Sequence, residues 1–189
     1  TLKSGRNSPY FFNAAKMLNT KFLADLSECY TKTLQDLDVS FDSIYGPAYK
    51  GIFLASIIGA SLGKSNLDIP VSFNRKEEKD HGEGGDLIGQ PPSGNVLIID
   101  DVISAGTAAR ESIEKIKSIG ANPKVMLVGL DRQEKGSSEI SAKAELENDF
   151  GLTVSSIVNL DLLISFVSDD PNFKEFKSDL EEYRSNWGA

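Results

Sequence analysis

The stretch at residues 95–109, which reads NVLIIDDVISAGTAA, constrains the fold of this chain more than any other part of the sequence. Its unbroken apolar run at residues 96–99 is typical of a strand that is buried on both faces of a parallel sheet. Residues 108–119 carry apolar side chains at helical spacing, and Gly120 is placed to stop that helix. The small residues between the two elements therefore lie in a strand-to-helix turn at the carboxyl end of a central strand.

The predicted turn has the chemistry of an anion site. Open α/β sheets bind ligands at the carboxyl ends of their strands, where a helix start offers free backbone N–H groups and a positive dipole end to a phosphate. Gly106 allows the backbone to approach an anion closely, and Ser104 and Thr107 add hydroxyl donors. The adjacent carboxylates of Asp100 and Asp101 suit a diol or a hydrated metal ion. A buried strand that ends in an acidic turn, without a ligand, is the alternative interpretation.

Composition limits the class of protein. A chain of 189 residues with 40% hydrophobic residues can bury one good core, so we expect a single domain over residues 1–189. The net charge of -8 argues against nucleic acid or an anionic membrane surface as a partner. The chain shows no secretory segment or long apolar span, and its single cysteine, Cys29, cannot form an internal disulfide. We therefore expect a cytoplasmic protein.

Helices and strands alternate along the rest of the chain. Apolar patterning predicts helices at residues 19–37, 52–62, 137–150, 159–167 and 171–183, and strands at residues 41–45, 69–73, 124–130 and 153–158. This alternation predicts an α/β fold with a central parallel sheet and helices on both faces. We expect the last helix, which is strongly acidic, to be peripheral.

Two segments carry aromatic and basic side chains together. The opening segment, TLKSGRNSPYFFN, combines Lys3 with Phe11 and Phe12. It fits either a short edge strand with an aromatic plug or a surface that receives a flat, anionic ring. The segment GPAYKG places Tyr49 and Lys50 at the carboxyl end of another predicted strand, although a plain tight turn would also explain its glycines and proline.

A long segment at residues 74–94 concentrates further basic side chains. It has five glycines and two prolines and lacks apolar periodicity, so we expect a mobile lid. A solvated charged loop is the alternative, because neighbouring acidic residues nearly cancel its positive charge. The basic side chains are those of Arg75, Lys76, Lys79 and His81.

Four of these motifs resemble those of a known family. The stretch at residues 95–109 looks like the phosphoribosyl-pyrophosphate signature of the type I phosphoribosyltransferases. The strings TLKSGRNSPYFFN, GPAYKG and FNRKEEKDHGEGG are similar to the substrate hood, the pyrophosphate loop and the mobile catalytic loop of the orotate phosphoribosyltransferase family. The motifs follow the family order and spacing, so the resemblance covers nearly the whole chain.

The resemblance implies the type I phosphoribosyltransferase fold, with a small N-terminal hood that includes residues 1–18. It implies a glycosyltransferase that moves a phosphoribosyl group from 5-phospho-α-D-ribose 1-diphosphate (PRPP) to orotate, which gives orotidine 5′-phosphate and pyrophosphate in pyrimidine biosynthesis. It also implies a homodimer in which the loop at residues 74–94 is shared across the interface. Magnesium would be held mainly through PRPP and water, near Asp100 and Asp101, and the peptide bond between Ala48 and Tyr49 is the candidate for the cis bond that such loops often contain.

The resemblance also assigns roles to individual residues. Arg132, which by its place at a strand end alone would be a surface residue, would pair with the orotate carboxylate. The other implied orotate contacts are Phe11, Phe12 and Ser104. The implied PRPP contacts are Lys3, Tyr49, Lys50, Arg75, Lys76, Lys79, His81, Asp100, Asp101, Val102, Ile103, Ser104, Ala105, Gly106, Thr107 and Ala108. The implied catalytic set is Arg75, Lys76, Lys79, His81, Asp100 and Asp101.

Two alternatives to orotate transfer follow from the same motifs. A transferase for a purine or for uracil would share the phosphate turn but not the hood strings TLKSGR and PYFFN. A non-enzymatic PRPP sensor that binds nucleic acid would keep the turn at residues 104–108 but would need a basic face. The acidic charge balance and the complete lid segment argue against the sensor.

Overall fold

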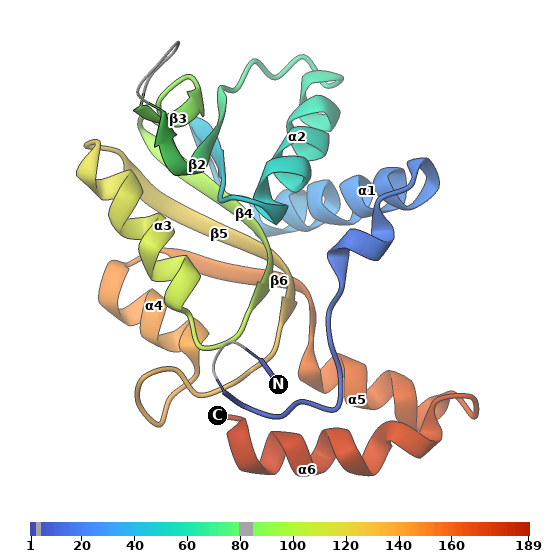
Figure 1. The fold of residues 1–189 in the computed structure, drawn as a ribbon. Helices are drawn as coiled ribbons and strands as arrows, with labels where there is room; N and C mark the ends of the chain where they lie inside the picture. The colour runs from blue at the N-terminus through green and yellow to red at the C-terminus, as the bar shows by residue number, and fades with distance from the viewer. Residues whose placement is uncertain (3–4, 80–84) are drawn as a thin grey trace.

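A mixed six-stranded sheet forms the centre of the protein (Figure 1). The computed structural model describes the backbone of residues 1–2, 5–79 and 85–189, and the side chains in these ranges except at residues 76–79. The strands are β1 Ser43–Gly46, β2 Val71–Lys79, β3 Gly85–Gly89, β4 Asn95–Ile103, β5 Asn122–Asp131 and β6 Thr153–Asn159. They lie in the order β3-β2-β1-β4-β5-β6, and every neighbouring pair is parallel except β2 and β3. The parallel part of the sheet confirms the predicted α/β class.

Helices cover both faces of this sheet, as predicted (Figure 1). They are η1 Ala14–Met17, α1 Thr20–Leu37, α2 Lys50–Gly63, α3 Thr107–Ser118, α4 Ala142–Phe150, α5 Leu160–Asp169, η2 Lys174–Phe176 and α6 Lys177–Trp187, where η marks a 3-10 helix. None of the helices in the described ranges is both long and apolar enough to cross a membrane.

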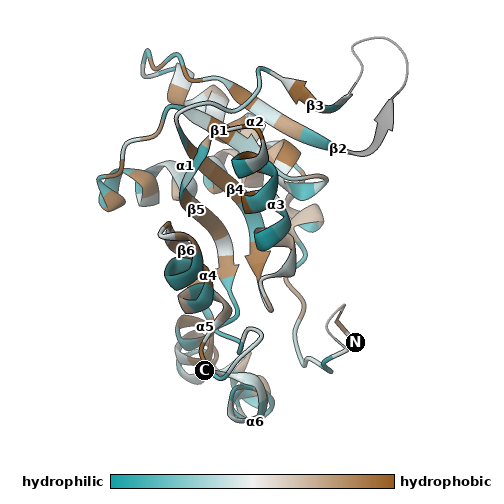
Figure 2. Ribbon diagram, turned by 90° about the vertical axis from the view of Figure 1, so that its left-hand side faces the viewer, coloured by the Kyte–Doolittle hydropathy of each residue, from teal (hydrophilic) through white to brown (hydrophobic). Residues whose placement is uncertain are grey.

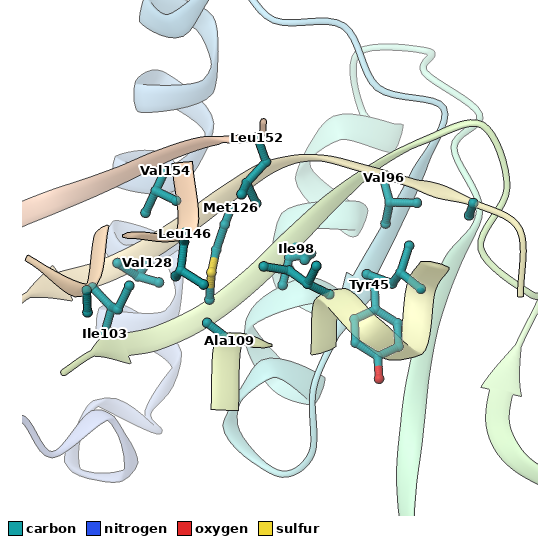
Figure 3. Packing of buried hydrophobic residues seen from close by; sticks show 14 residues of the cluster. Tyr45, Val96, Ile98, Ile103, Ala109, Met126, Val128, Leu146, Leu152 and Val154 are labelled. Atoms are coloured by element: carbon teal, nitrogen blue, oxygen red, sulfur yellow. The ribbon is translucent and has the colours of Figure 1, made fainter. Parts of the chain in front are cut away.

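The side chains of the central strand β4 pack against both helical layers. Leu97 and Ile99 point to the face that α1 and α2 cover. Val96 and Ile98 point to the opposite face, where they pack in the cluster formed with α3 and α4 (Figure 3). All four side chains are buried, and each burial of this kind contributes about 1.5–3 kcal/mol of hydrophobic stabilisation. An unbroken apolar run is therefore what a strand between two helical layers requires.

Two predicted helices begin later than the apolar pattern indicates. The helix predicted at residues 137–150 begins only at Ala142, as α4. Residues 137–141 form a loop, in which the backbone N–H of Ser137 donates to the carboxylate of Glu145. In the helix predicted at residues 171–183, the Asp170 carboxylate accepts a backbone N–H two residues further on. The resulting turn leads into η2, and α6 follows it.

The prediction of a lid without secondary structure at residues 74–94 is wrong for part of that segment. β2 continues to Lys79 and pairs with β3 in an antiparallel hairpin, in which Phe73 lies opposite Ile88 (Figure 2). β2 is already paired with β1 at the edge of the sheet. β3 adds to that edge through backbone hydrogen bonds, which form without an alternation of apolar and polar residues in the sequence. The tip at residues 80–84 lies outside the described residues.

Both ends of the chain contribute to a small subdomain beyond the carboxyl end of β6, which we call the hood: residues 5–13, α5 and α6 (Figure 1). Tyr10 packs against Leu160 and Leu180, and its ring meets that of Tyr183 edge-on at 5.9 Å between centroids. Leu180 and Tyr183 are the buried side chains of α6, and this helix packs on α5 and η2 away from the sheet, so it has the peripheral position predicted from its acidity. Residues 5–13 of the predicted hood segment thus share this subdomain with α5 and α6.

Candidate active site

The carboxyl ends of β1, β4 and β5 meet at one edge of the sheet, because these neighbouring strands are parallel. A cavity of about 440 Å³, which we call the hood cavity, opens at this edge. It gathers predicted site residues from separate segments: Phe11, Phe12, Tyr49, Lys50, Asp100, Asp101, Val102, Ser104, Ala108 and Arg132. The fold thus places aromatic, acidic, basic and phosphate-turn residues around one space.

The two acidic side chains near the end of β4 have different surroundings. Asp101 is only 5% exposed, and its Oδ2 accepts a hydrogen bond from Lys50 Nζ at 2.5 Å. Asp100 is half-buried, and its Oδ1 accepts the backbone N–H of Asp101 at 2.9 Å. Burial and the neighbouring Asp101 carboxylate raise the pKa of Asp100 to about 7. The pair therefore favours a ligand that supplies positive charge or hydroxyl donors.

The turn from β4 into α3, which we call the phosphate turn after its predicted role (residues 104–108), is the strand-to-helix turn predicted from the sequence. Gly106 precedes α3 with a φ of 83°, in the left-handed region that favours glycine. The first N–H groups of α3 have no acceptor within the helix, so they are available to an anion. A cavity of about 340 Å³ lies against this turn and is lined by Val102, Ile103, Ser104, Ala105, Gly106, Thr107, Ala108, Ala109 and Glu111.

The turn between β1 and α2 contains a cis peptide bond between Ala48 and Tyr49, which confirms the expectation drawn from the resemblance. Asn74 contacts this turn, because its Oδ1 accepts the backbone N–H of Ala48 at 2.7 Å. Sequence reasoning missed Asn74, since an asparagine at the start of a charged segment forms no motif of its own. Only the pairing of β1 with β2 brings it to the turn.

A second cavity, of about 450 Å³, adjoins the hood cavity, since Ala48 and Asp100 line both. Arg75 lines this second cavity, together with Asp86 and Lys115, which form an ion pair. Arg75 Nε is buried and has no hydrogen-bond partner among the described residues. The cavity is lined by the basic side chains of Arg75 and Lys115 and by the acidic side chains of Asp86, Asp100 and Glu111.

Arg132 is not the surface residue that its place at a strand end suggests, because it is only 2% exposed. Its Nε donates to Glu134 Oε1 at 2.5 Å, and its Nη2 donates to Ser8 Oγ at 2.7 Å. The guanidinium carbon lies 4.0 Å from the centroid of the Tyr10 ring. Arg132 nevertheless lines the hood cavity, as Phe12 does. Sequence reasoning missed Glu134, which carries no recognisable motif.

Some predicted site residues are not placed by the structure. Lys3 and His81 lie outside the described residues, as do the side chains of Lys76 and Lys79, so their roles stay predictions. Within the described part of the chain, no group of three or more His, Cys, Asp or Glu side chains is arranged to hold a metal ion. A metal at the carboxylate pair would therefore need most of its ligands from a substrate and from water.

Curated relatives and solved structures both point to one family. No family model matches the chain. The chain is 49% identical over 189 residues to an orotate phosphoribosyltransferase of Pseudomonas putida and 47% identical to one of Marinobacter nauticus, with 100% of this chain and 89% of each relative covered. The crystal structure of orotate phosphoribosyltransferase from Francisella tularensis matches with a TM-score of 0.81 at 38% identity, covering 100% of this chain and 91% of that chain. The chain therefore belongs to the orotate phosphoribosyltransferase family.

Proposed function

We propose that this protein transfers the phosphoribosyl group of PRPP to orotate and so makes orotidine 5′-phosphate and pyrophosphate. The hood cavity carries the proposal, because it joins the carboxylate pair and the phosphate turn to an aromatic surface that contains an arginine. The two substrates, a phosphorylated sugar and a flat anion, need these two kinds of surface side by side. The family to which the chain belongs supports the same reaction.

The donor occupies the sheet side of the cavity in this proposal. The turn at residues 104–108 binds the 5-phosphate, and Asp100 and Asp101 bind the ribose hydroxyls. When the bond between ribose C1 and the pyrophosphate oxygen breaks, positive charge develops on the ribose ring. The two carboxylates then stabilise this charge more strongly than they stabilise the neutral sugar, and such a difference is what accelerates a reaction.

Basic side chains stabilise the pyrophosphate as it leaves. Lys50 at the hood cavity and Arg75 at the adjoining cavity are the described side chains that we assign to this role. Lys3, Lys76, Lys79 and His81 are expected to add to them from segments whose side chains are not described. Removal of one such donor costs about 3 kcal/mol of activation free energy, or about a hundredfold in rate.

The acceptor occupies the hood side of the cavity. Orotate is a planar anion, so the rings of Phe11 and Phe12 bracket its ring and Arg132 pairs with its carboxylate. Its ring nitrogen forms a bond to ribose C1 as the bond from C1 to the pyrophosphate oxygen breaks, and the proton of that nitrogen passes to water or to the leaving pyrophosphate. We assign no general base to this step.

The carboxylate pair fits magnesium, because this ion prefers oxygen ligands and commonly binds one or two carboxylates together with substrate phosphates and water. The ion would be held mainly through PRPP and water near Asp100 and Asp101, and when bound it would supply positive charge to the phosphates. We also propose a cytoplasmic homodimer in which the catalytic loop at residues 74–94 of one protomer completes the site of its partner. The resemblance of that loop to the family supports the shared arrangement.

A panel of nucleobases tests the proposed reaction. The protein is mixed with magnesium and PRPP, and the absorbance of orotate, uracil, guanine or adenine is followed in parallel reactions. We expect consumption of orotate alone, because only orotate offers a carboxylate to Arg132. Consumption of a different base would contradict the assignment of the hood, and a protein that binds PRPP without consuming any base would contradict the enzymatic function.

A further inference from the structure

Glu134 lies at the centre of a buried cluster that joins three distant parts of the chain. It is 1% exposed. Its Oε1 accepts hydrogen bonds from Arg132 Nε at 2.5 Å and from the hydroxyl of Tyr183 at 2.7 Å. Its Oε2 accepts a hydrogen bond from Arg6 Nη1 at 2.7 Å. One carboxylate therefore connects the N-terminal segment of the hood, the loop that follows β5, and α6.

The cluster fixes one edge of the Arg132 guanidinium. Glu134 takes its Nε, while Ser8 Oγ and the Tyr183 hydroxyl accept from its Nη2 at 2.7 and 3.1 Å. The Tyr10 ring packs against its face. No described residue accepts a hydrogen bond from Nη1, and Arg132 lines the hood cavity. Since a guanidinium is planar and rigid, holding Nε and Nη2 also fixes the direction in which Nη1 points.

The charges of the cluster suit an anionic substrate. Two guanidinium groups, of Arg6 and Arg132, share the single carboxylate of Glu134, so these directly bonded groups retain one unit of positive charge. Without Glu134, the buried Arg132 and the half-buried Arg6 would both lose their acidic partner, which is strongly unfavourable. With it, Arg132 can remain buried and ordered while the surplus charge attracts a carboxylate in the adjoining cavity.

The Glu134 carboxylate also anchors the N-terminal segment of the hood, which carries Phe11 and Phe12, through its bond to Arg6. Arg6 bonds to Glu134 and, through Nη2, to the carbonyl oxygen of Lys135 at 3.0 Å, and its guanidinium lies 4.9 Å from the Trp187 ring centroid. These contacts anchor the segment that leads directly to Phe11 and Phe12. The orientation of Arg132 and the position of the two phenylalanines therefore depend on one buried group.

Resting on the proposed function, we infer that Glu134 is a positioning residue for orotate, which directs Arg132 Nη1 into the hood cavity and holds the aromatic segment beside it. Glu134 touches no substrate in this scheme, since both of its carboxylate oxygens are engaged within the cluster. Nor does it bond to the phosphate turn or to Lys50. Its loss should therefore weaken the use of orotate selectively and leave the binding of PRPP intact.

The test is Glu134→Gln in the full-length protein, which keeps the size of the side chain but removes its charge. We expect the KM for orotate to rise about tenfold, as the loss of charge-assisted hydrogen bonds predicts, while the dissociation constant for PRPP stays unchanged. Glu139→Gln is the matched control, because Glu139 is an exposed glutamate whose side chain, 88% exposed, pairs only with Lys135 at 2.5 Å. The control should keep the orotate KM of the unaltered protein.

A milder variant decides the result if Glu134→Gln does not fold. Tyr183→Phe removes only the hydroxyl that bonds both Glu134 and Arg132, so the KM for orotate should rise a few-fold. A purely structural role would lower thermal stability and active fraction at an unchanged orotate KM, and that result would overturn the inference. If the unaltered protein consumes no orotate, the proposed function itself fails, whereas normal turnover with unchanged KM in the folded variants refutes only the role of Glu134.

Discussion

The donor side and the acceptor side of the hood cavity are built in different ways. On the donor side, Asp100 and Asp101 lie near the end of β4 and the phosphate turn follows that strand. Lys50, the first residue of α2, reaches Asp101 from the turn after the neighbouring strand β1. On the acceptor side, Arg132 is held by residues from both ends of the chain. The donor site thus rests on the strand ends of a buried sheet, and the acceptor site rests on contacts between separate segments.

This difference explains what each half can contribute. Strand ends between packed helical layers hold charged groups in fixed positions, which is what the stabilisation of a developing charge requires. A hood assembled from the two chain ends can differ between relatives without disturbing the sheet, so base selection can be placed there. Changes on the donor side should therefore affect the chemical step, and changes on the acceptor side should affect the affinity for orotate.

The largest effect is expected from removing both carboxylates of the donor side. Asp100→Asn combined with Asp101→Asn should lower kcat/KM by about a thousandfold or more, because the charge on the ribose would develop without its anionic partners. Steady-state kinetics gives the loss, and circular dichroism shows whether the fold is kept. Substantial activity in a folded double variant would show that these residues do not hold the ribose.

The next largest effect tests the base that pairs with Asp101. Lys50→Gln should lower kcat/KM for PRPP about a hundredfold, with little change in the KM for orotate. Because Asp101 would then be buried without its partner, the free energy of unfolding should also fall, by about 1–3 kcal/mol. Lys64→Gln, at an exposed position beyond α2, is the control and should alter neither quantity. A rise in the orotate KM alone would place Lys50 on the wrong side of the cavity.

The acceptor side is tested by Arg132→Lys. Lysine keeps the positive charge but lacks the planar fork, so the KM for orotate should rise by about tenfold or more. Calorimetric titration should show unchanged PRPP binding, because the Arg132 side chain bonds to Glu134, Ser8 and Tyr183 and not to the phosphate turn. If PRPP binding weakened as strongly as orotate binding, the division of the cavity into two independently built sides would be wrong.

A smaller effect is expected from the hydrogen bond that Asn74 accepts from the turn between β1 and α2. Asn74→Ala removes the acceptor for the Ala48 N–H, and the KM for PRPP should rise a few-fold, as the loss of one hydrogen bond predicts. Asn122→Ala is the control, since the exposed Asn122 side chain donates only to Asn95 Oδ1, at 2.7 Å. Equal kinetics in both variants would mean that Asn74 does not position the turn.

A final effect, on stability rather than on kinetics, is expected as a function of pH. The pKa of Asp100 is about 7 in the folded protein, above the unfolded value of about 3.9, so the folded state holds this proton more tightly. Stability from this group is therefore present below about pH 4 and is lost as the pH rises toward 7. The Asp100→Asn variant cannot lose this proton, so between pH 5 and pH 8 its melting temperature should rise relative to that of the unaltered protein. Parallel melting curves would show that Asp100 does not titrate in this range.

Much of the fold could be predicted because its central strands need no context. β4 and β5 are buried on both faces, so their apolar runs are recognisable from sequence alone. The hairpin of β2 and β3 could not be predicted, because the string NRKEEK has no apolar alternation and its strand depends on the edge offered by β1. The same holds for the loop before α4, which is set by the carboxylate of Glu145.

The candidate site divides along the same line. Asp100, Asp101 and the phosphate turn lie in one contiguous motif, so sequence reasoning could select them. The ion pair of Lys50 with Asp101 could not be predicted, because it requires the parallel order of β1 and β4. Glu134 could not be found at all, since its partners Arg6 and Tyr183 come from opposite ends of the chain.

The most direct measurement follows orotate consumption and pyrophosphate release in the same reaction. We expect the two to proceed in equal amounts with magnesium and PRPP present, and pyrophosphate release to be negligible when orotate is left out. This outcome would show that the phosphoribosyl group passes to the acceptor on the hood side and not to water. Pyrophosphate release without consumption of orotate would contradict phosphoribosyl transfer as the function of this protein.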